Sequence, residues 1–222
     1  MMVMMSNLPY HIPVLLQPCI DGLEINPDGV YVDLTFGGGG HSKEILKHLS
    51  AKGKLFSFDQ DEDAKANIPD DKRLTFIPHN FRYISNYLKL YGITQVDGIL
   101  GDLGVSSHQF DKGERGFSTR FDAGLDMRMN QKSDLTAKKV LNTYDVKKLT
   151  AMFREYGEVD NAFRLANIIF EARTNGSIET TDQFKVVIKP CTPKFEEGKY
   201  LAKVYQAIRI EVNQEMEALK EC

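Results

Sequence analysis

The residue types that could do chemistry in this chain are concentrated between positions 33 and 59. Asp33 precedes four consecutive glycines, Gly37 to Gly40, and His41 follows them directly. A backbone without Cβ atoms can turn tightly and let a ligand approach its N–H groups. Asp59 lies 22 residues after Gly37, a spacing at which a carboxylate can accept hydrogen bonds from ribose hydroxyls. These residues predict a site for a nucleotide or a nucleoside.

A strand, a turn, a helix and a second strand must position these residues. Residues 30–34 are β-branched, aromatic and aliphatic around Asp33, which is typical of a strand. Ile45, Leu46 and Leu49 then follow with helical spacing, and residues 55–58 form a second apolar run that stops at Asp59. This order is half of a nucleotide-binding α/β unit.

The glycine turn does not match the two commonest phosphate-binding patterns. Lys43 and Glu44 stand where a dinucleotide fingerprint needs its third glycine, and no Gly-Lys-Ser/Thr ending is present. With Asp33 in front, the segment resembles the D-x-x-x-G-x-G loop of S-adenosylmethionine-dependent methyltransferases. That resemblance implies that an acidic group, here Asp33, helps to hold the cofactor's ammonium group. A glycine-rich surface turn in an unrelated α/β protein is the alternative.

Two further strands extend the pattern to a sheet. Residues 74–77, and residues 96–104 with the exit from their strand, alternate with helical segments, which predicts a Rossmann-like α/β fold with a parallel sheet. Ligands of such sheets bind outside the carboxyl ends of the strands. Asp33, Asp59, Phe81 and Asp102 all fall at such ends, so we expect them to share one edge.

The pattern changes after Ser106. Residues 106–135 mix glycine, aromatic residues and arginine without periodicity, and an irregular stretch of this length inside a compact domain is usually functional or disordered. Its aromatic residues and methionines argue against disorder, so we expect it to be ordered. The rest is helical, with segments predicted at residues 137–142, 145–156, 164–172, 181–189 and 200–220. Between Lys138 and Arg209, 13 basic residues outnumber 9 acidic ones, whereas the whole chain carries a net charge of −3. This helical part either faces a polyanion or is an ordinary solvated surface.

The composition limits the class of protein. The 222 residues carry a hydrophobic content of 42%, and the sequence has no apolar run of about 18 residues, so no membrane span is expected. The three cysteines are far apart and the five histidines lack ligand spacing, which predicts neither a disulfide framework nor a metal site. We expect a cytoplasmic protein.

Three motifs between residues 102 and 129 resemble one known family. They are Asp102–Ser107 (DLGVSS), Arg115–Ser118 (RGFS) and Leu125–Met129 (LDMRM). Together they are similar to the bacterial 16S rRNA (cytosine-N4) methyltransferases, the MraW-like family. The resemblance runs in collinear order through almost the whole chain, and includes residues 11–16, 35–42, 156–158 and 206–209. At position 159 this chain has Val where the family commonly has a second Glu.

The resemblance implies a fold, a reaction and partners. It implies a class I S-adenosylmethionine-dependent methyltransferase sheet with a helical insert. The expected domains are a cofactor-binding domain at 1–112, a substrate-recognition insert at 113–199, and a helix at 200–222 that returns to the first domain. The implied reaction is methylation of N4 of a cytidine in 16S rRNA of the small ribosomal subunit, with S-adenosyl-L-methionine as cofactor. A homodimer is left open.

The resemblance also assigns cofactor-binding roles. The backbone N–H groups of the glycine turn should contact the cofactor, Asp59 should bind its ribose, Phe81 should pack on its adenine, and Gln109 should form a hydrogen bond nearby. The complete expected set is Asp33, Gly39, Gly40, His41, Asp59, Phe81, Asp102 and Gln109. For His41, a buried structural role is an equal alternative.

Asp102 has two competing roles. At the end of the fourth strand its carboxylate could orient the cytosine amine and draw off developing positive charge, which would make it catalytic. It could instead contact the cofactor. Arg115, Arg128 and Arg209 are candidates for RNA phosphate contacts or, in our preferred interpretation, for tying loops to the insert.

Two further expectations concern the end of the chain and the alternative functions. A class I sheet continues beyond a fourth strand, and the family's Gly-Gly-Arg and Ser-Phe-His-Ser-Leu-Glu-Asp-Arg segments do not occur before Cys222, so we expect a truncated chain. The alternatives to a methyltransferase are a non-catalytic RNA-binding or assembly factor and a nucleotide-dependent oxidoreductase, which would use the same glycine turn and Asp59.

Overall fold

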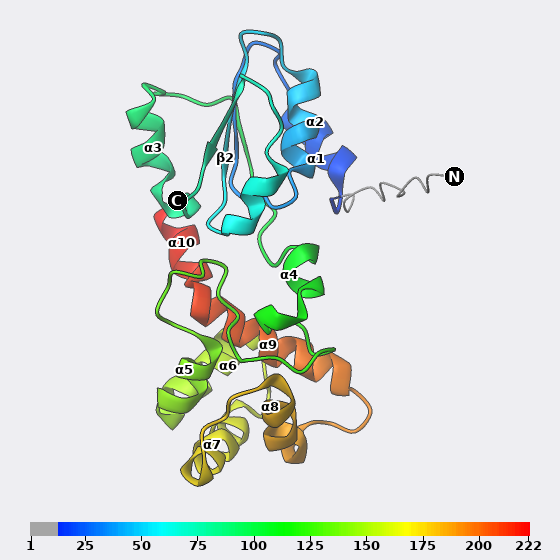
Figure 1. The fold of residues 1–222 in the computed structure, drawn as a ribbon, viewed down its shortest axis with the longest axis vertical. Helices are drawn as coiled ribbons and strands as arrows, with labels where there is room; N and C mark the ends of the chain where they lie inside the picture. Colours follow the sequence, from blue (N-terminus) through cyan, green and yellow to red (C-terminus); the bar gives the residue numbers. More distant parts are fainter. Residues whose placement is uncertain (1–12) are drawn as a thin grey trace, which may run out of the picture. The chain divides into compact units, whose positions relative to one another are not determined.

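The protein divides into two compact units. The computed structural model describes residues 13–222, so His11 and Ile12 of the N-terminal motif lie outside the described part. The first unit contains residues 13–106 with 221–222, and the second contains residues 107–220 (Figure 1). The predicted domain limits at 112 and 199 are functional assignments and stay a prediction.

The first unit is a parallel sheet with helices on its faces. Its elements are α1 (Leu16–Leu23), β1 (Val30–Asp33), α2 (Gly40–His48), β2 (Lys54–Phe58), the 3-10 turn η1 (Glu62–Asn67), β3 (Leu74–Ile77), the 3-10 turn η2 (Phe81–Tyr83), α3 (Ile84–Leu90) and β4 (Gly98–Leu100). The strand order is β3-β2-β1-β4, and every neighbouring pair is parallel. The predicted Rossmann-like α/β fold of a class I methyltransferase is therefore confirmed.

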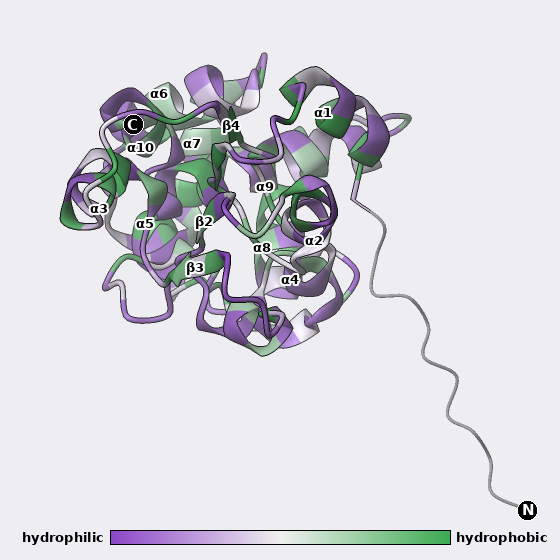
Figure 2. Ribbon diagram, turned by 90° about the horizontal axis from the view of Figure 1, so that it is seen from above, coloured by the Kyte–Doolittle hydropathy of each residue, from purple (hydrophilic) through white to green (hydrophobic). Residues whose placement is uncertain are grey.

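Alternating side chains of the strands fill two hydrophobic clusters. Tyr31 and Leu55 pack with residues of α1 and α2, whereas their neighbours Val32 and Phe56 pack in the other cluster with Ile84 of α3. This alternation follows from the period of two along a strand. The strands β3 and β4 are accordingly coloured as hydrophobic in Figure 2.

The second unit is helical. Its elements are α4 (Ser107–Asp111), the 3-10 turn η3 (Gly113–Arg115), α5 (Ala137–Thr143), α6 (Val146–Gly157), α7 (Ala162–Ala172), the 3-10 turn η4 (Arg173–Asn175), α8 (Thr181–Ile188), the 3-10 turn η5 (Lys189–Cys191), α9 (Glu197–Asn213) and α10 (Glu215–Glu221), whose last residue falls in the first unit. The helices begin at side-chain caps where the sequence supplies them. Thr180 and Gln183, for example, form a capping box at the start of α8.

The prediction of one continuous helix over residues 200–220 is wrong. The chain forms α9 and α10, separated by Gln214 in the left-handed conformation with φ of 50°. Helical periodicity continues across this break, so the sequence pattern alone does not reveal it. A bidentate pair holds the two helices at the break, because Arg209 Nε and Nη2 lie 2.8 and 3.2 Å from the two carboxylate oxygens of Glu215.

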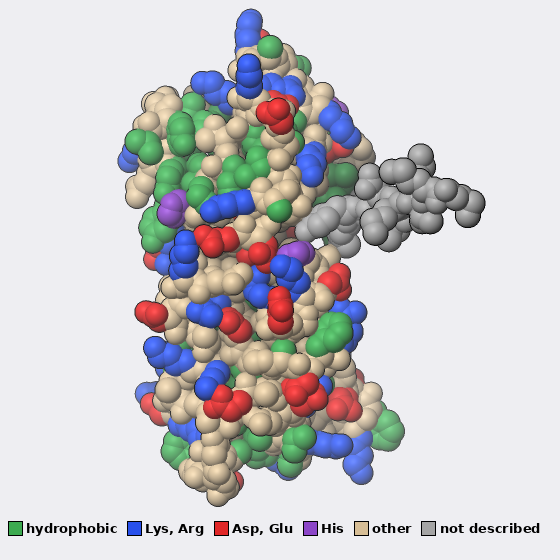
Figure 3. Space-filling model, in the orientation of Figure 1, with side chains coloured by type: hydrophobic (Ala, Val, Ile, Leu, Met, Phe, Trp, Pro, Cys, Tyr) green, Lys and Arg blue, Asp and Glu red, His purple; other side chains and the backbone are tan. Residues whose placement is uncertain are grey.

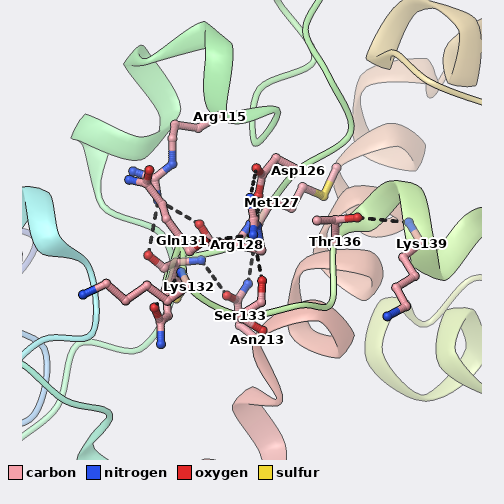
Figure 4. A network of polar contacts seen from close by, with 12 residues as sticks. Arg115, Asp126, Met127, Arg128, Gln131, Lys132, Ser133, Thr136, Lys139 and Asn213 are labelled. Atoms are coloured by element: carbon pink, nitrogen blue, oxygen red, sulfur yellow. Dashed lines mark hydrogen bonds and ion pairs between the residues drawn. The ribbon is translucent and has the colours of Figure 1, made fainter.

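Hydrogen bonds hold the irregular segment 113–134 against α9. Asn213 donates from Nδ2 to the carbonyl of Met127 at 2.8 Å and accepts from the backbone N–H of Met129 at 2.7 Å (Figure 4). Met127 itself is fully buried with φ of 59°. A single side chain thus anchors the backbone at two positions of the LDMRM motif, in agreement with the expectation that this stretch is ordered.

We predict that Asn213→Ala lowers the free energy of unfolding by about 1–3 kcal/mol, because it leaves partly buried backbone groups of Met127 and Met129 without their partner. Urea denaturation followed by far-UV circular dichroism measures this. Asn167→Ala is the matched control, since Asn167 Nδ2 only bonds a carbonyl within its own helix, and it should stay within about 0.5 kcal/mol of the parent. Equal effects of both variants would contradict the anchor.

Candidate functional site

The glycine turn joins β1 to α2 and leaves the start of α2 open. The N–H of Gly39 bonds the carbonyl of Phe36 at 2.7 Å, and Gly39 itself is the N-cap residue with φ of 76°. No side chain caps this helix within the described residues. The N–H groups of its first turn have no intrahelical partner, and the helix dipole favours negative charge there. The turn can therefore bind an anionic or hydrogen-bond-accepting group.

Two of the glycines are required by close packing. A Cβ atom on Gly39 would lie 2.7 Å from the ring of Phe36, and one on Gly40 would lie 2.2 Å from Pro13 Cγ. Gly39 also has the positive φ that side chains disfavour. The turn is thus packed tightly against its neighbours, which does not fit the alternative of a simple surface turn.

Asp59 is bonded directly to the glycine turn. Its Oδ2 accepts from the N–H of Gly37 at 2.7 Å, and its Oδ1 accepts from the N–H of Asp61 at 2.8 Å. Burial raises the pKa of Asp59 to about 6, although these two N–H groups favour the ionised form. Each carboxylate oxygen keeps a second lone-pair direction for an outside donor such as a hydroxyl. The carboxylate and the glycine turn, 22 positions apart in the sequence, therefore meet.

Asp33 lies beneath the turn and is fully buried. Its Oδ1 accepts from the N–H of Thr35 at 3.0 Å, and its Oδ2 accepts from Ser42 Oγ at 2.6 Å. Ser42 Oγ is also 2.8 Å from Ser57 Oγ on β2. Burial raises the pKa of Asp33, and the hydrogen bonds from Ser42 and Thr35 offset part of that rise. This network ties β1, α2 and β2 together, and direct contact of Asp33 with the cofactor stays a prediction.

His41 occupies the first turn of α2. The residue is buried, and its Nε2 has no hydrogen-bond partner among residues 13–222. A buried polar atom without a partner is costly unless a ligand supplies one. The structure is compatible with both interpretations of His41. Its burial fits a structural role, and its Nε2 without a partner among residues 13–222 fits a contact with a ligand.

Asp102 and Phe81 complete the carboxyl edge of the sheet. The N–H of Asp102 donates to Thr35 Oγ1 at 2.8 Å, which places the end of β4 beside the end of β1, and the residue is exposed. Phe81 begins η2 after β3 and is half-buried. Asn80, which caps that turn, donates from Nδ2 to Gln60 Oε1 at 3.1 Å, next to Asp59.

Gln109 belongs to the second unit. It is buried in α4, the first helix of that unit. The edge of the sheet therefore brings together every predicted site residue except this one. Thr35, Ser42 and Ser57 are supporting residues that the sequence reasoning did not single out. The one signal for Ser57 is a polar residue inside the apolar strand 54–58.

The three arginines proposed for RNA or for loop support make contacts within the second unit. Arg115 donates from Nη2 to the carbonyls of Arg128 and Met129 at 2.7 and 3.3 Å. Arg128 forms a bidentate pair with Asp126 and also bonds the carbonyls of Gln131 and Ser133 (Figure 4).

With the Arg209–Glu215 pair described above, all three guanidinium groups bind groups of the protein itself. These contacts favour the interpretation in which the arginines tie loops together. Although burial opposes it, the Arg128 guanidinium holds the pKa of Asp126 below its usual value.

The residues at the sheet edge can form hydrogen bonds with a ligand that carries hydroxyls and an anionic group. The uncapped start of α2 and the unpartnered His41 Nε2 offer polar groups, and Asp59 offers acceptors for hydroxyls. Within residues 13–222, no three His, Cys, Asp or Glu side chains are grouped to hold a metal ion. No helix in that range has the length and apolar character to cross a membrane.

Comparison with known proteins gives a consistent result. The family model described as the MraW methylase family matches residues 9–222. The protein named "Ribosomal RNA small subunit methyltransferase H" of Flavobacterium johnsoniae is 61% identical over 218 residues, which cover 98% of this chain and 72% of that protein. The proteins of the same name from Christiangramia forsetii and Bacteroides thetaiotaomicron are 57% and 56% identical, with 98% and 97% of this chain and 72% and 71% of theirs covered.

We predict that Ser42→Ala destabilises the protein by about 1–3 kcal/mol, because it removes a donor to the buried Asp33 carboxylate. The folded-state pKa of Asp33 is raised, so its contribution to stability is greatest at low pH and falls as pH rises through that pKa. Loss of the Ser42 hydroxyl raises this pKa further. The variant should therefore lose more stability at neutral than at acidic pH.

Urea titrations of both proteins across this pH range measure the difference. Ser57→Ala is the control, since Ser57 Oγ contacts Ser42 and makes no hydrogen bond to Asp33 among the described residues. The stability that Ser57→Ala loses should change less with pH than the stability that Ser42→Ala loses. A pH-independent loss in Ser42→Ala would show that Ser42 does not stabilise the ionised Asp33.

Proposed function

Because this chain belongs to the MraW methylase family, we propose that it uses S-adenosylmethionine to methylate RNA of the small ribosomal subunit. The observation that carries the proposal is the 2.7 Å hydrogen bond between Gly37 and Asp59, since it joins a carboxylate suited to ribose hydroxyls to the glycine turn. In its finer form the proposal is that the acceptor is N4 of a cytidine in 16S rRNA, as the DLGVSS, RGFS and LDMRM motifs suggest.

The cofactor's parts match groups along the sheet edge. The first-turn N–H groups at Gly40 and His41 can donate to a carboxylate or carbonyl of the ligand. Asp59 is the acceptor for the ribose hydroxyls, and Phe81 supplies an apolar surface for the adenine. Asp33 supports the turn, and Gln109 keeps its predicted polar contact with the cofactor in this proposal. When bound, the cofactor supplies a methyl carbon that is electrophilic because it is attached to a sulfonium.

Asp102 is the residue that we assign to the acceptor nitrogen. The lone pair of a cytosine amine is delocalised into the ring, so N4 is a weak nucleophile. An exposed carboxylate at the end of β4 can accept a hydrogen bond from that amine and hold it in line for attack. The same carboxylate stabilises the positive charge that develops on N4 and can take up the proton that N4 loses as the new N–C bond forms.

The second unit is the part that we assign to the RNA. Its helical segment between Lys138 and Arg209 carries 13 basic and 9 acidic residues within a chain of net charge −3. All of residues 113–199, the predicted recognition insert, lie in this unit. The family match favours methyl transfer over the hydride transfer that the glycine turn alone also allowed.

We predict that the chain transfers radiolabelled methyl groups to small ribosomal subunits that lack its modification, and that digestion yields N4-methylcytidine. Asp102→Ala should lower the rate of transfer by about 10²- to 10³-fold, because it removes a group that stabilises the transition state. Its affinity for the cofactor, measured by calorimetry, should change little.

Asp70→Asn is the matched control, because Asp70 is an exposed carboxylate of the same unit. It should transfer at the parental rate. A label on another atom of the base would contradict N4 as the acceptor. Tight cofactor binding without any transfer by the parent protein would favour the non-catalytic RNA-binding factor.

We also predict a pH dependence of cofactor affinity. Ribose hydroxyls donate to the ionised Asp59, whose pKa burial raises to about 6. Affinity should therefore be constant above about pH 7 and fall by about tenfold per pH unit well below 6, where Asp59 is protonated. Calorimetric titration with the cofactor across this range measures it. Asp59→Asn should bind weakly at every pH, and an identical slope in that variant would assign the titration to another group.

A further inference from the structure

Two phenylalanines of the second unit are more exposed than any other phenylalanine in residues 13–222. Phe195 is 100% exposed in the segment between η5 and α9, and Phe163 is 64% exposed at the start of α7. By contrast, Phe153 and Phe184 of the same unit are fully buried. Figure 3 shows hydrophobic and basic side chains next to one another over the α7–α8 end of this unit. Large exposed apolar side chains indicate a binding surface where they gather in one region.

Hydrogen bonds bring these two rings to the same end of the unit. Asn161 donates from Nδ2 to the carbonyl of Cys191 at 2.8 Å, and its Oδ1 accepts from Tyr200 at 2.8 Å. Cys191 and Tyr200 are the two ends of the segment that carries Phe195. Both ends are thus fixed to Asn161, which is two residues before Phe163, so the segment lies beside the start of α7.

Basic residues are close to both phenylalanines along the chain. Arg164, next to Phe163, donates to the carbonyl of Pro190 at 3.0 Å, which places its guanidinium at η5. Lys189 and Lys194 are exposed and form no ion pair within residues 13–222. The next acidic residue along the chain is Glu196, the N-cap residue of α9.

We propose that this aromatic–basic surface, made of Phe163, Arg164, Lys189, Lys194 and Phe195, binds a single-stranded segment of the RNA substrate. The proposal rests on the proposed function for the presence of RNA, and it adds where the second unit contacts it. Unpaired bases stack on aromatic rings, and neighbouring phosphates bind lysine and arginine.

A duplex fits this surface less well, because its bases are stacked on one another and not available to the phenylalanines. A second copy of this chain also fits poorly, since it would bring the same cations together. The combination of exposed rings and exposed lysines therefore favours a flexible, single-stranded polyanion.

The test is fluorescence anisotropy with a fluorescein-labelled single-stranded oligoribonucleotide, alongside a duplex of the same sequence. Phe163→Ala and Phe195→Ala should each weaken binding of the single strand by about tenfold, since each removes the partner of one stacked base. The duplex should bind more weakly and be less affected. Phe170→Ala is the matched control: Phe170 is 41% exposed on the same helix, but the Arg173 guanidinium already lies 4.6 Å from its ring centroid. It should bind like the parent.

The role of the cations is measured by salt dependence. For single strands, the slope of log K against log salt becomes shallower by about 0.7 for each phosphate that the protein no longer neutralises. Lys189→Gln and Lys194→Gln should each reduce the slope by that amount. Lys147→Gln, on the exposed side of α6, should leave it unchanged.

The outcomes separate this proposal from the proposed function. If Phe163→Ala and Phe195→Ala bind the single strand like the parent, the surface is not an RNA site, even when binding to intact subunits falls, because the partner there would be a protein. Methyl transfer by the parent protein can then still occur. Conversely, ring-dependent RNA binding without methyl transfer would support this surface and overturn the proposed enzyme. Parental far-UV circular dichroism and thermal unfolding of both variants show that the second unit, which carries the two phenylalanines, remains folded.

Discussion

A fully buried carboxylate beneath the glycine turn is the constraint on which the site geometry depends. An isolated ionised carboxylate in a protein interior is costly, so it must be hydrogen-bonded. Asp33 meets this requirement with donors from Thr35 and Ser42, which belong to the turn's two ends. Because the donors are local, the path of the backbone between them is fixed. The hydrogen bonds that one buried carboxyl group requires thus fix the conformation of the turn.

The three aspartates at the sheet edge differ in environment, and this difference separates their roles. Asp33 is closed off from solvent, Asp59 is half-buried with a raised pKa, and Asp102 is exposed. A parallel sheet places all three at one edge, since each follows a strand whose direction is shared. The different burial of the three carboxylates then separates them. Asp33 supports the turn, Asp59 is accessible enough to bind hydroxyls in our proposal, and Asp102 is exposed to a substrate.

The sheet and most of its edge could be predicted from the sequence, because they depend on local patterns. The runs at 30–34, 55–58 and 74–77 are short and apolar, and each became a strand. The break at Gln214 could not be predicted, because a residue other than glycine rarely adopts the left-handed conformation. The Arg209–Glu215 pair spans this break, and its two residues are six positions apart, a spacing that does not place them on one face of a continuous helix.

The supporting network was also invisible in the sequence. Ser42 of α2 and Ser57 of β2 are 15 residues apart, and their hydroxyls meet only when α2 packs against the paired strands β1 and β2.

The division of labour between arginine and lysine in the second unit follows from their chemistry. Arg115 and Arg128 bind several carbonyls at once, which a planar guanidinium with five donors does well. They hold the LDMRM segment in place and are therefore committed to the fold. Lys189 and Lys194 extend into solvent, where a mobile ammonium can follow a flexible phosphate backbone. The charges that fold this unit and the charges available to a polyanion are thus different residues, so the two roles can be separated by mutation.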